Sequence, residues 1–306
     1  MAEFSSIEAV QEGLRTHNYV SDRGLATTLF LSLSMNRPLF LEGEAGVGKT
    51  EVAKVLANML DTDLIRLQCY EGLDVHSAVY EWNYARQILQ IRMLEAGTQQ
   101  DINAIQKEIY SDAYLIKRPL LQSIEAESRP VVLLIDELDR ADEEFEAFLL
   151  EILSDFQITI PELGTIKAKH PPHVIITSNR TREIHDALKR RCLYHWVDYP
   201  SFKKELEIIQ TRVPELPGSL AREVVAFLHE LRTTDLYKQP GVAETIDWSR
   251  ALLALSQNNL THEVVDETLG TLLKYHDDIT KVAGAQSSAI LEQAKVRLTE
   301  MENSAN

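Results

Sequence analysis

The chain has 306 residues, of which 44% are hydrophobic and 25% charged, so it can bury a core large enough to offset the entropy cost of folding. Its net charge of -16 disfavours free nucleic acid as a partner, because affinity for a phosphate backbone comes from clustered lysines and arginines. Two cysteines, Cys69 and Cys192, are too few for a disulfide framework or a zinc cluster, and the sequence leaves their role open.

The sequence also bears on the compartment. No apolar run approaches the ~20 residues that cross a bilayer. The first residues, MAEFSSIEAVQEG, carry acids where a secretory signal has a basic segment. We therefore expect a cytoplasmic protein without a transmembrane segment.

Up to about Pro200, short β-rich runs alternate with amphipathic stretches, which is typical of a parallel sheet with helices on both faces. The pattern predicts strands at 38–42, 64–67, 131–135 and 174–177, and helices at 22–34 and 51–60. Residues 157–170 alternate around a Pro-Glu-Leu-Gly turn and predict a hairpin.

The remainder of the chain is helical in pattern. Prolines and Gly241 separate four predicted helices at 201–212, 218–231, 246–257 and 261–276. The last thirty residues suit either a final helix or a frayed tail. We therefore predict an α/β domain of residues 1–200 and a smaller all-α domain of residues 201–306.

A glycine-rich segment follows the first predicted strand. Residues 43–50 read G-x-x-x-x-G-K-T and precede a predicted helix, the context in which backbone N–H groups and a helix N-terminus surround phosphates. Lys49 would reach the phosphate oxygens, and Thr50 would offer its hydroxyl to Mg²⁺. The predicted nucleotide-binding residues are Gly43, Glu44, Ala45, Gly46, Val47, Gly48, Lys49, Thr50 and Glu51. The alternative is a glycine turn between a strand and a helix.

Two carboxylates end the apolar strand predicted at 131–135. Asp136 would hold Mg²⁺ together with Thr50, and Glu137 would orient and deprotonate the water that attacks the γ-phosphate. The alternative is that Asp136 caps a following helix. The nearby phosphate loop favours the catalytic interpretation.

Later residues narrow the class of nucleotide enzyme. The guanine-reading motif N-K-x-D is not present in the sequence, which disfavours a GTPase. The strand predicted at 174–177 leads to Asn179, whose amide could contact the γ-phosphate and the attacking water. A predicted helix end carries Arg190 and Arg191, and an arginine at a domain edge could reach a neighbour's nucleotide.

At this point the sequence resembles the AAA+ ATPases, and more closely the MoxR family. The resemblance covers about residues 20–260 and rests on LFLEGEAGVGKTEVAKVLA, LLIDELDRADEEFEAFLLEILSDFQITI, VIITSN, VDYPSF and IDWSRALLAL. The segment LIRLQCYEGLDVHSAVYEWNYARQIL is similar to the branch encoded beside carbon monoxide dehydrogenase and other molybdenum hydroxylases.

The resemblance implies roles for matching positions. Lys49 and Thr50 fall on the Walker A motif, and Asp136 and Glu137 fall on Walker B. Asn179 falls on sensor 1. Arg250 falls on the sensor 2 arginine that begins a helix of the lid, the second domain. The implied insertions lie near 70–92 and at 157–170.

The sequence departs from the family pattern at the arginine finger. Relatives usually have Arg followed by Phe, whereas here Arg191 precedes Cys192 and follows another arginine, so Arg191 is favoured and Arg190 stays open. Many relatives have Asn where this chain has Asp139, and the segment from Asn179 to Arg191 is short.

Several of these positions have a plainer structural interpretation. Arg250 could be a surface helix residue, and Arg190 and Arg191 could stabilise the C-terminal end of their own helix. Apart from Asp136 and Glu137, most of the nine acids between 136 and 155 would form a solvated helix face. Tyr80, Trp82 and Tyr84 are expected to pack in the core, with a partner-binding patch as the alternative. His170 and His173 are expected to be structural.

The expected activity is hydrolysis of ATP with Mg²⁺. Resemblance to the MoxR family implies a ring, expected to be a hexamer, that remodels a client metalloenzyme during cofactor insertion with a von Willebrand A-domain protein as partner. One rival is a nucleic-acid motor, supported only by Lys167 and Lys169 in the hairpin. Another rival is a nucleotide-gated scaffold with negligible turnover. A small-molecule kinase is the least favoured.

Overall fold

The computed structural model describes residues 4–95 and 108–305. The chain divides into two compact units. Unit 1 comprises Met1–His17, Ser21–Glu42 and Thr50–Trp196, and unit 2 comprises Asn18–Val20, Gly43–Lys49 and Val197–Asn306. The domain boundary at residue 200 stays a prediction. Among the described residues, no helix is long and apolar enough to cross a membrane.

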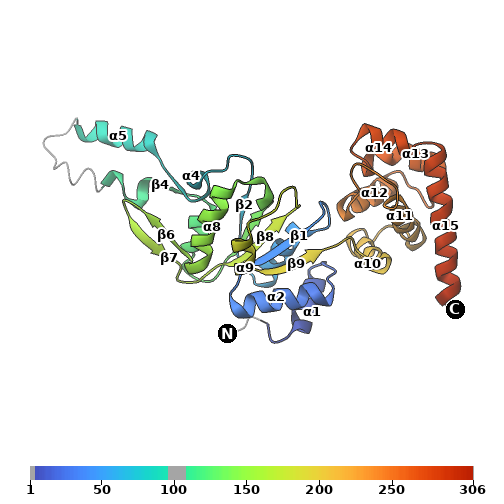
Figure 1. The fold of residues 1–306 in the computed structure, drawn as a ribbon, viewed down its shortest axis with the longest axis horizontal. Coiled ribbons are helices and arrows are strands. Elements are labelled where there is room, and N and C mark those ends of the chain that lie inside the picture. Colours follow the sequence, from blue (N-terminus) through green and yellow to red (C-terminus); the bar gives the residue numbers. More distant parts are fainter. Residues whose placement is uncertain (1–3, 96–107, 306) are drawn as a thin grey trace. The chain divides into compact units, whose positions relative to one another are not determined.

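The centre of unit 1 is a five-stranded sheet in the order β2-β5-β8-β1-β9 (Figure 1). Its strands are β1 (Leu39–Gly43), β2 (Leu64–Gln68), β5 (Val132–Asp136), β8 (His173–Ser178) and β9 (Leu193–Val197). The pairs β1–β8, β2–β5 and β5–β8 are parallel. The predicted fold, a parallel sheet followed by helices, is confirmed. The sequence analysis missed β9, because this edge strand interrupts its apolar residues with Tyr194 and His195.

Helices accompany this sheet along the chain. They are α1 (Ile7–Thr16), α2 (Arg23–Met35), α3 (Lys49–Met59), α4 (Val75–Ala78), α5 (Tyr84–Glu95), α7 (Pro119–Ile124), α8 (Glu143–Asp155) and α9 (Asp186–Arg191), with 3-10 turns η1 (Asp112–Tyr114) and η2 (Leu138–Arg140). Two small antiparallel sheets pair β3 (Tyr80–Trp82) with β4 (Leu115–Lys117) and β6 (Gln157–Ile160) with β7 (Gly164–Lys167). The second is the predicted hairpin.

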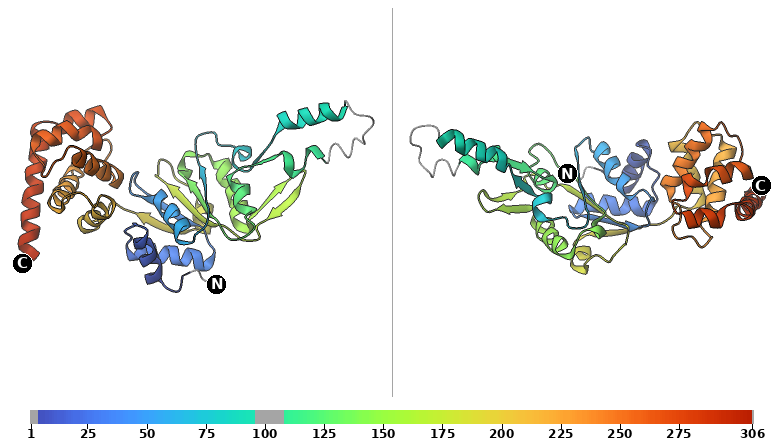
Figure 2. Two further views of the ribbon diagram at one scale, coloured as in Figure 1. Left: turned by 180° about the vertical axis from the view of Figure 1, so that it is seen from behind. Right: turned by 90° about the horizontal axis from the view of Figure 1, so that it is seen from above.

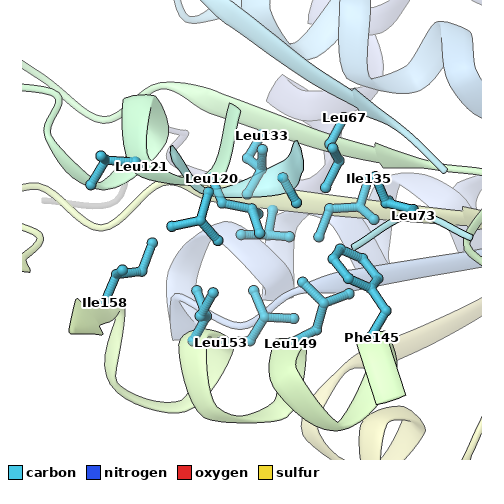
Figure 3. Close-up of a cluster of buried hydrophobic side chains, with 14 of the residues drawn as sticks. Leu67, Leu73, Leu120, Leu121, Leu133, Ile135, Phe145, Leu149, Leu153 and Ile158 are labelled. Carbon is cyan, nitrogen blue, oxygen red and sulfur yellow. The ribbon is translucent and has the colours of Figure 1, made fainter. Parts of the chain in front are cut away.

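Figure 3 shows the cluster of apolar side chains through which α8 packs against the sheet. Phe145, Leu149 and Leu153 recur every four residues, so they lie on one face of α8, where they pack toward Leu133 and Ile135 of β5. All five are at most 5% exposed. This packing fixes β5 up to the two carboxylates that follow Ile135.

The aromatic run after residue 79 is divided between two elements. Tyr80 and Trp82 lie on β3, and their rings meet edge to face with centroids 6.1 Å apart. Trp82 is buried, as expected. The prediction of core packing is wrong for Tyr84, because the strand ends at Trp82 and Tyr84 begins α5 with 62% of its surface exposed.

Unit 2 contains a bundle of six helices (Figure 2). They are α10 (Phe202–Arg212), α11 (Gly218–Leu231), α12 (Val242–Ala254), α13 (His262–Leu272), α14 (His276–Val282) and α15 (Ala285–Ala305). The last thirty residues form a final helix. The single helix predicted at 261–276 is wrong, because the backbone of Leu273 is extended and separates α13 from α14.

The helix predicted at 246–257 begins one turn earlier, at Val242. Gly241 is its N-cap, and the side chain of Glu244 accepts a hydrogen bond from the Gly241 N–H at 2.9 Å. This one-sided cap satisfies the Gly241 N–H at the helix end just after Pro240, where the sequence suggested only a break. Arg250 therefore lies within α12, and the prediction that it begins a helix is wrong.

A buried ion pair joins three helices of unit 2. Glu205 of α10 is 0% exposed and accepts two hydrogen bonds from the Arg232 guanidinium, at 2.6 and 2.8 Å. His229 Nε2 lies 3.1 Å from the same carboxylate, and the Thr245 hydroxyl of α12 donates to it at 2.8 Å. Burial raises the pKa of Glu205, but the hydrogen bonds from His229, Arg232 and Thr245 outweigh burial and lower that pKa below its ordinary value of 4.5.

We expect Glu205→Gln to destabilise the chain at pH 7 by about 3 kcal/mol, because it leaves the buried Arg232 without its countercharge. Since the folded pKa of Glu205 is depressed, its contribution to stability is complete above pH 4.5 and is lost as pH falls through the folded value. The difference in the free energy of unfolding between the parent and Glu205→Gln should therefore become smaller in acid. Urea unfolding at pH 7 and pH 4 measures it, with exposed Glu215→Gln as control. A difference that is constant with pH would contradict the charge argument.

Candidate active site

The glycine-rich loop follows β1 directly and leads into α3. Gly46 and Gly48 have φ angles of +79° and +95°, the left-handed backbone that glycine adopts without strain. Lys49 is 5% exposed, and its Nζ donates to the carbonyls of Gly43 and Glu44 at 2.7 and 2.6 Å. The loop thus folds around its own lysine through two of its carbonyl groups; in this motif the backbone N–H groups and the lysine are the groups that bind phosphate.

Asp136 ends β5 and is 1% exposed. Its Oδ1 accepts hydrogen bonds from the Thr50 hydroxyl of α3, at 2.9 Å, and from the Thr177 hydroxyl of β8, at 2.6 Å. Asp136 caps no helix, since its donors come from α3, β8 and β2. The structure therefore brings together Thr50 and Asp136, the two residues predicted to hold Mg²⁺.

Arg66 on β2 also contacts Asp136, and the sequence analysis missed it. Its Nε and Nη2 donate to Asp136 Oδ2 at 3.0 and 2.6 Å, and half of its side chain is exposed. The in-register pairing of β2 with β5 places Arg66 opposite Leu134 and Gln68 opposite Asp136. The sequence did contain a signal for Arg66: it is a charged residue between two apolar residues of a predicted strand.

Glu137 follows Asp136 in the left-handed conformation, with φ of +55°. Its Oε1 accepts from the Asn179 amide at 3.3 Å, and its Oε2 accepts from the Gln68 amide at 3.1 Å. Its backbone N–H donates to the Thr177 hydroxyl at 2.9 Å. The structure thus places the predicted base beside the predicted sensor 1 residue and adds Gln68, which the sequence analysis missed.

Asp139 follows Glu137 by two residues and is 3% exposed. Its Oδ1 accepts from the Asn179 N–H at 3.1 Å, and its Oδ2 accepts from the N–H and hydroxyl of Thr181 at 2.9 and 2.7 Å. An amide would present donors to one of these groups. Both carboxylate oxygens are therefore used to hold the loop that carries Asn179.

The three predicted arginines make contacts of their own within their units. Arg190 and Arg191 end α9 and are exposed, and Arg190 pairs with Asp186 at 2.6 Å. The Arg37 side chain donates to the backbone carbonyls of both residues, which fixes the end of the helix. Arg250 is 56% exposed and lies 3.9 Å from Asp247. Within unit 1, the hydrogen bonds and ion pairs of the described residues join neither Arg190 nor Arg191 to Glu137.

Both cysteines are buried. Burial raises the pKa of Cys69 to about 12, with a further contribution from Asp136, and burial raises that of Cys192 to about 12. Both thiols therefore stay protonated at neutral pH, and a protonated thiol is a poor nucleophile and metal ligand.

The residues present fit a nucleotide-bound magnesium ion. Mg²⁺ keeps several waters and takes one or two protein oxygens together with phosphate oxygens. The Thr50 hydroxyl and the Asp136 carboxylate, 2.9 Å apart, supply such oxygens. Among the described residues no group of three or more His, Cys, Asp or Glu could hold a metal by itself. The site therefore suits a metal that arrives with phosphate.

Residues 38–192, half of the chain, match the family described as AAA domain (dynein-related subfamily). The chain belongs to this family. It is an ATPase of the AAA+ class, and its cofactors are ATP and Mg²⁺. The match covers the glycine-rich loop, Asp136 at the end of β5, Glu137 after it, and α9.

Individual similar proteins align with more of the chain than the family match does. An uncharacterized protein of Staphylococcus haemolyticus is 26% identical over 243 residues, which are 77% of this chain and 83% of that protein. An uncharacterized protein of Staphylococcus aureus is 27% identical over 228 residues, 72% of this chain and 77% of that protein. A solved structure of a RuvB mutant from Thermotoga maritima is 17% identical, with a TM-score of 0.48, and covers 90% of this chain and 73% of that chain.

We expect Thr177→Val to slow ATP hydrolysis and to destabilise the chain by about 1–3 kcal/mol, because it removes a buried donor to Asp136 and the acceptor of the Glu137 N–H. Steady-state turnover and urea unfolding measure the two effects. Thr159→Val, at an exposed threonine of β6, is the matched control. Parent-like turnover in Thr177→Val would contradict a role for this hydroxyl.

Proposed function

We propose that the chain is a chaperone-like ATPase of the MoxR type, which uses Mg²⁺ and ATP hydrolysis to remodel a client metalloenzyme during cofactor insertion. The observation that carries the hydrolytic part is the grouping of Thr50, Asp136, Glu137 and Asn179 at the carboxyl edge of the sheet. Parallel sheets bind ligands at this edge, at the position where the strand order reverses. In this sheet the chain runs from β1 to β2 at the far side, returns through β5 and β8, and places β9 on the other side of β1.

In this proposal, Glu137 accepts a proton from the attacking water. Asn179 and Gln68 each hold one oxygen of its carboxylate, which orients the base. Lys49 and the N–H groups of the glycine-rich loop bind the phosphates, while Thr50 and Asp136 hold the metal. Bound Mg²⁺ neutralises charge that develops on the phosphates.

The proposal extends to a ring, expected to be a hexamer, in which Arg191 reaches the nucleotide of a neighbour. Support comes from the exposure of the last turn of α9. Arg190, the other candidate for the arginine finger, pairs with Asp186 of its own helix at 2.6 Å. Arg37 holds the carbonyls of both residues, so the end of α9 is preorganised. Arg250 is proposed as the sensor 2 residue that links hydrolysis to the helical lid.

The client and partner come from the sequence resemblance. Similarity to the branch beside molybdenum hydroxylases supports a molybdenum enzyme, such as carbon monoxide dehydrogenase, as client and a von Willebrand A-domain protein as partner. The net charge of -16 argues against nucleic acid. The hairpin region carries exposed Glu162 beside exposed Lys167 and Lys169, so an acid offsets part of its positive charge.

Glu137→Gln should bind ATP with parent affinity and lose nearly all turnover, because the amide keeps the side-chain volume but accepts no proton. Phosphate release and the affinity for a fluorescent ATP analogue measure the two properties. Glu162→Gln, at the exposed turn of the hairpin, is the control and should hydrolyse ATP like the parent. Full turnover by Glu137→Gln would refute Glu137 as the base.

The same variant tests the client. Held in ATP, Glu137→Gln should retain a molybdenum enzyme and a von Willebrand A-domain protein co-expressed with it, and purified client should stimulate the parent ATPase. DNA should not stimulate it at low salt. Stimulation by DNA that declines steeply with added salt would instead support a nucleic-acid motor.

A further inference from the structure

The first turn of α12 packs directly against the glycine-rich loop, which belongs to the same compact unit. The Ala243 N–H donates to the Gly46 carbonyl at 3.1 Å. A Cβ atom on Gly241 would lie 2.8 Å from the Ala45 carbonyl oxygen and 2.9 Å from Gly46 Cα. The two backbones are therefore too close for a side chain at Gly241.

The contact is equally close from the side of the loop. A Cβ atom on Gly46 would lie 2.9 Å from the Glu244 carboxylate and 3.3 Å from Gly241 Cα. Gly46 also has φ of +79°, which disfavours any other residue. Two glycines that are almost 200 positions apart in the sequence thus meet without side chains between them.

This contact decides where one N–H group of the loop points. In a trans peptide the C=O and N–H bonds point in opposite directions. Because the Gly46 carbonyl is held toward Ala243, the N–H of Val47 points away from α12. Phosphate binding in such loops depends on N–H groups that converge on the anion.

We propose that the first turn of α12 positions the glycine-rich loop for ATP, with Gly241 as a positioning residue. This inference rests on the proposed role of Gly43–Thr50 as the phosphate site. It assigns a function in ATP affinity to a turn that lies eight residues before the predicted sensor 2 arginine, Arg250.

The turn is itself held by the side chains of Glu244 and Thr245. Glu244 accepts from the Gly241 N–H at 2.9 Å. The Thr245 hydroxyl lies 3.0 Å from the Gly241 carbonyl and 2.8 Å from the buried carboxylate of Glu205. The Glu205–Arg232 pair in the core of unit 2 is thus connected through Thr245 to the residue that contacts the loop. A shift of α12 would change the orientation of the Gly46–Val47 peptide.

Gly241→Ala tests the positioning role. The added methyl group must displace either α12 or the loop, so we expect KM for ATP to rise about tenfold, equivalent to ~1.4 kcal/mol, with a smaller change in kcat. Gly270→Ala in α13 is the matched control, because a Cβ there meets nothing within 4 Å. It should keep the parent KM. Equal KM values for Gly241→Ala and the parent would overturn the proposal.

A second pair of variants covers the case in which Gly241→Ala does not fold. Glu244→Ala removes the acceptor of the Gly241 N–H, whereas Glu244→Gln removes the same charge and keeps an acceptor. We expect KM for ATP to rise in Glu244→Ala and to be largely restored in Glu244→Gln. Equal KM values in the two variants would show that the cap does not position the loop.

Lys49→Ala separates this inference from the proposed phosphate site. Loss of binding of a fluorescent ATP analogue in Lys49→Ala, together with parent-like affinity in Gly241→Ala and Glu244→Ala, would refute the positioning role alone. Parent-like affinity in Lys49→Ala would refute the phosphate site and the inference with it. Unfolding midpoints without nucleotide, measured for Glu244→Ala, Glu244→Gln and the parent, show whether a change in affinity is accompanied by a loss of stability.

Discussion

The carboxylate of Asp136 is the group on which the active-site geometry depends. It is 1% exposed, and burying a charge is costly unless hydrogen bonds replace the lost water. Thr50, Thr177 and Arg66 supply those hydrogen bonds from three different elements. One buried charge therefore ties α3, β8 and β2 to the end of β5.

A series of buried acids continues this arrangement past β5. Asp139 holds the backbone of Asn179 and the N–H and hydroxyl of Thr181. Glu146 of α8, also 1% exposed, accepts from the His185 N–H at 2.8 Å and pairs with Arg182. These two carboxylates fix the segment between the sensor position and α9. Arg190 and Arg191, at the end of α9, therefore follow a short segment that is held in place at both ends within unit 1.

The helical unit is organised around a different charge, that of Glu205. Its contacts with Arg232 and Thr245 link the core of the bundle to the first turn of α12, and the first turn of α12 contacts Gly46. The glycine-rich loop is thus supported by backbone from the helical part of the chain as well as by β1 and α3.

The sequence alone determined four of the five strands of the central sheet, the hairpin, the glycine-rich loop and the pair Asp136 and Glu137, because each has a local signal: an apolar run, a turn or a fixed spacing. It could not determine which side chains meet from different strands. Arg66, Gln68 and Thr177 became visible only when parallel pairing placed β2 and β8 beside β5. The acids between 136 and 155 looked alike as a solvated face, yet Asp139 and Glu146 are buried because loops from elsewhere in the chain fold over them.

The start of α12 was misplaced for the same reason. Its N-cap is a glycine, which local propensity interprets as a break, and the close approach of Gly46 that requires glycine there exists only in the tertiary structure.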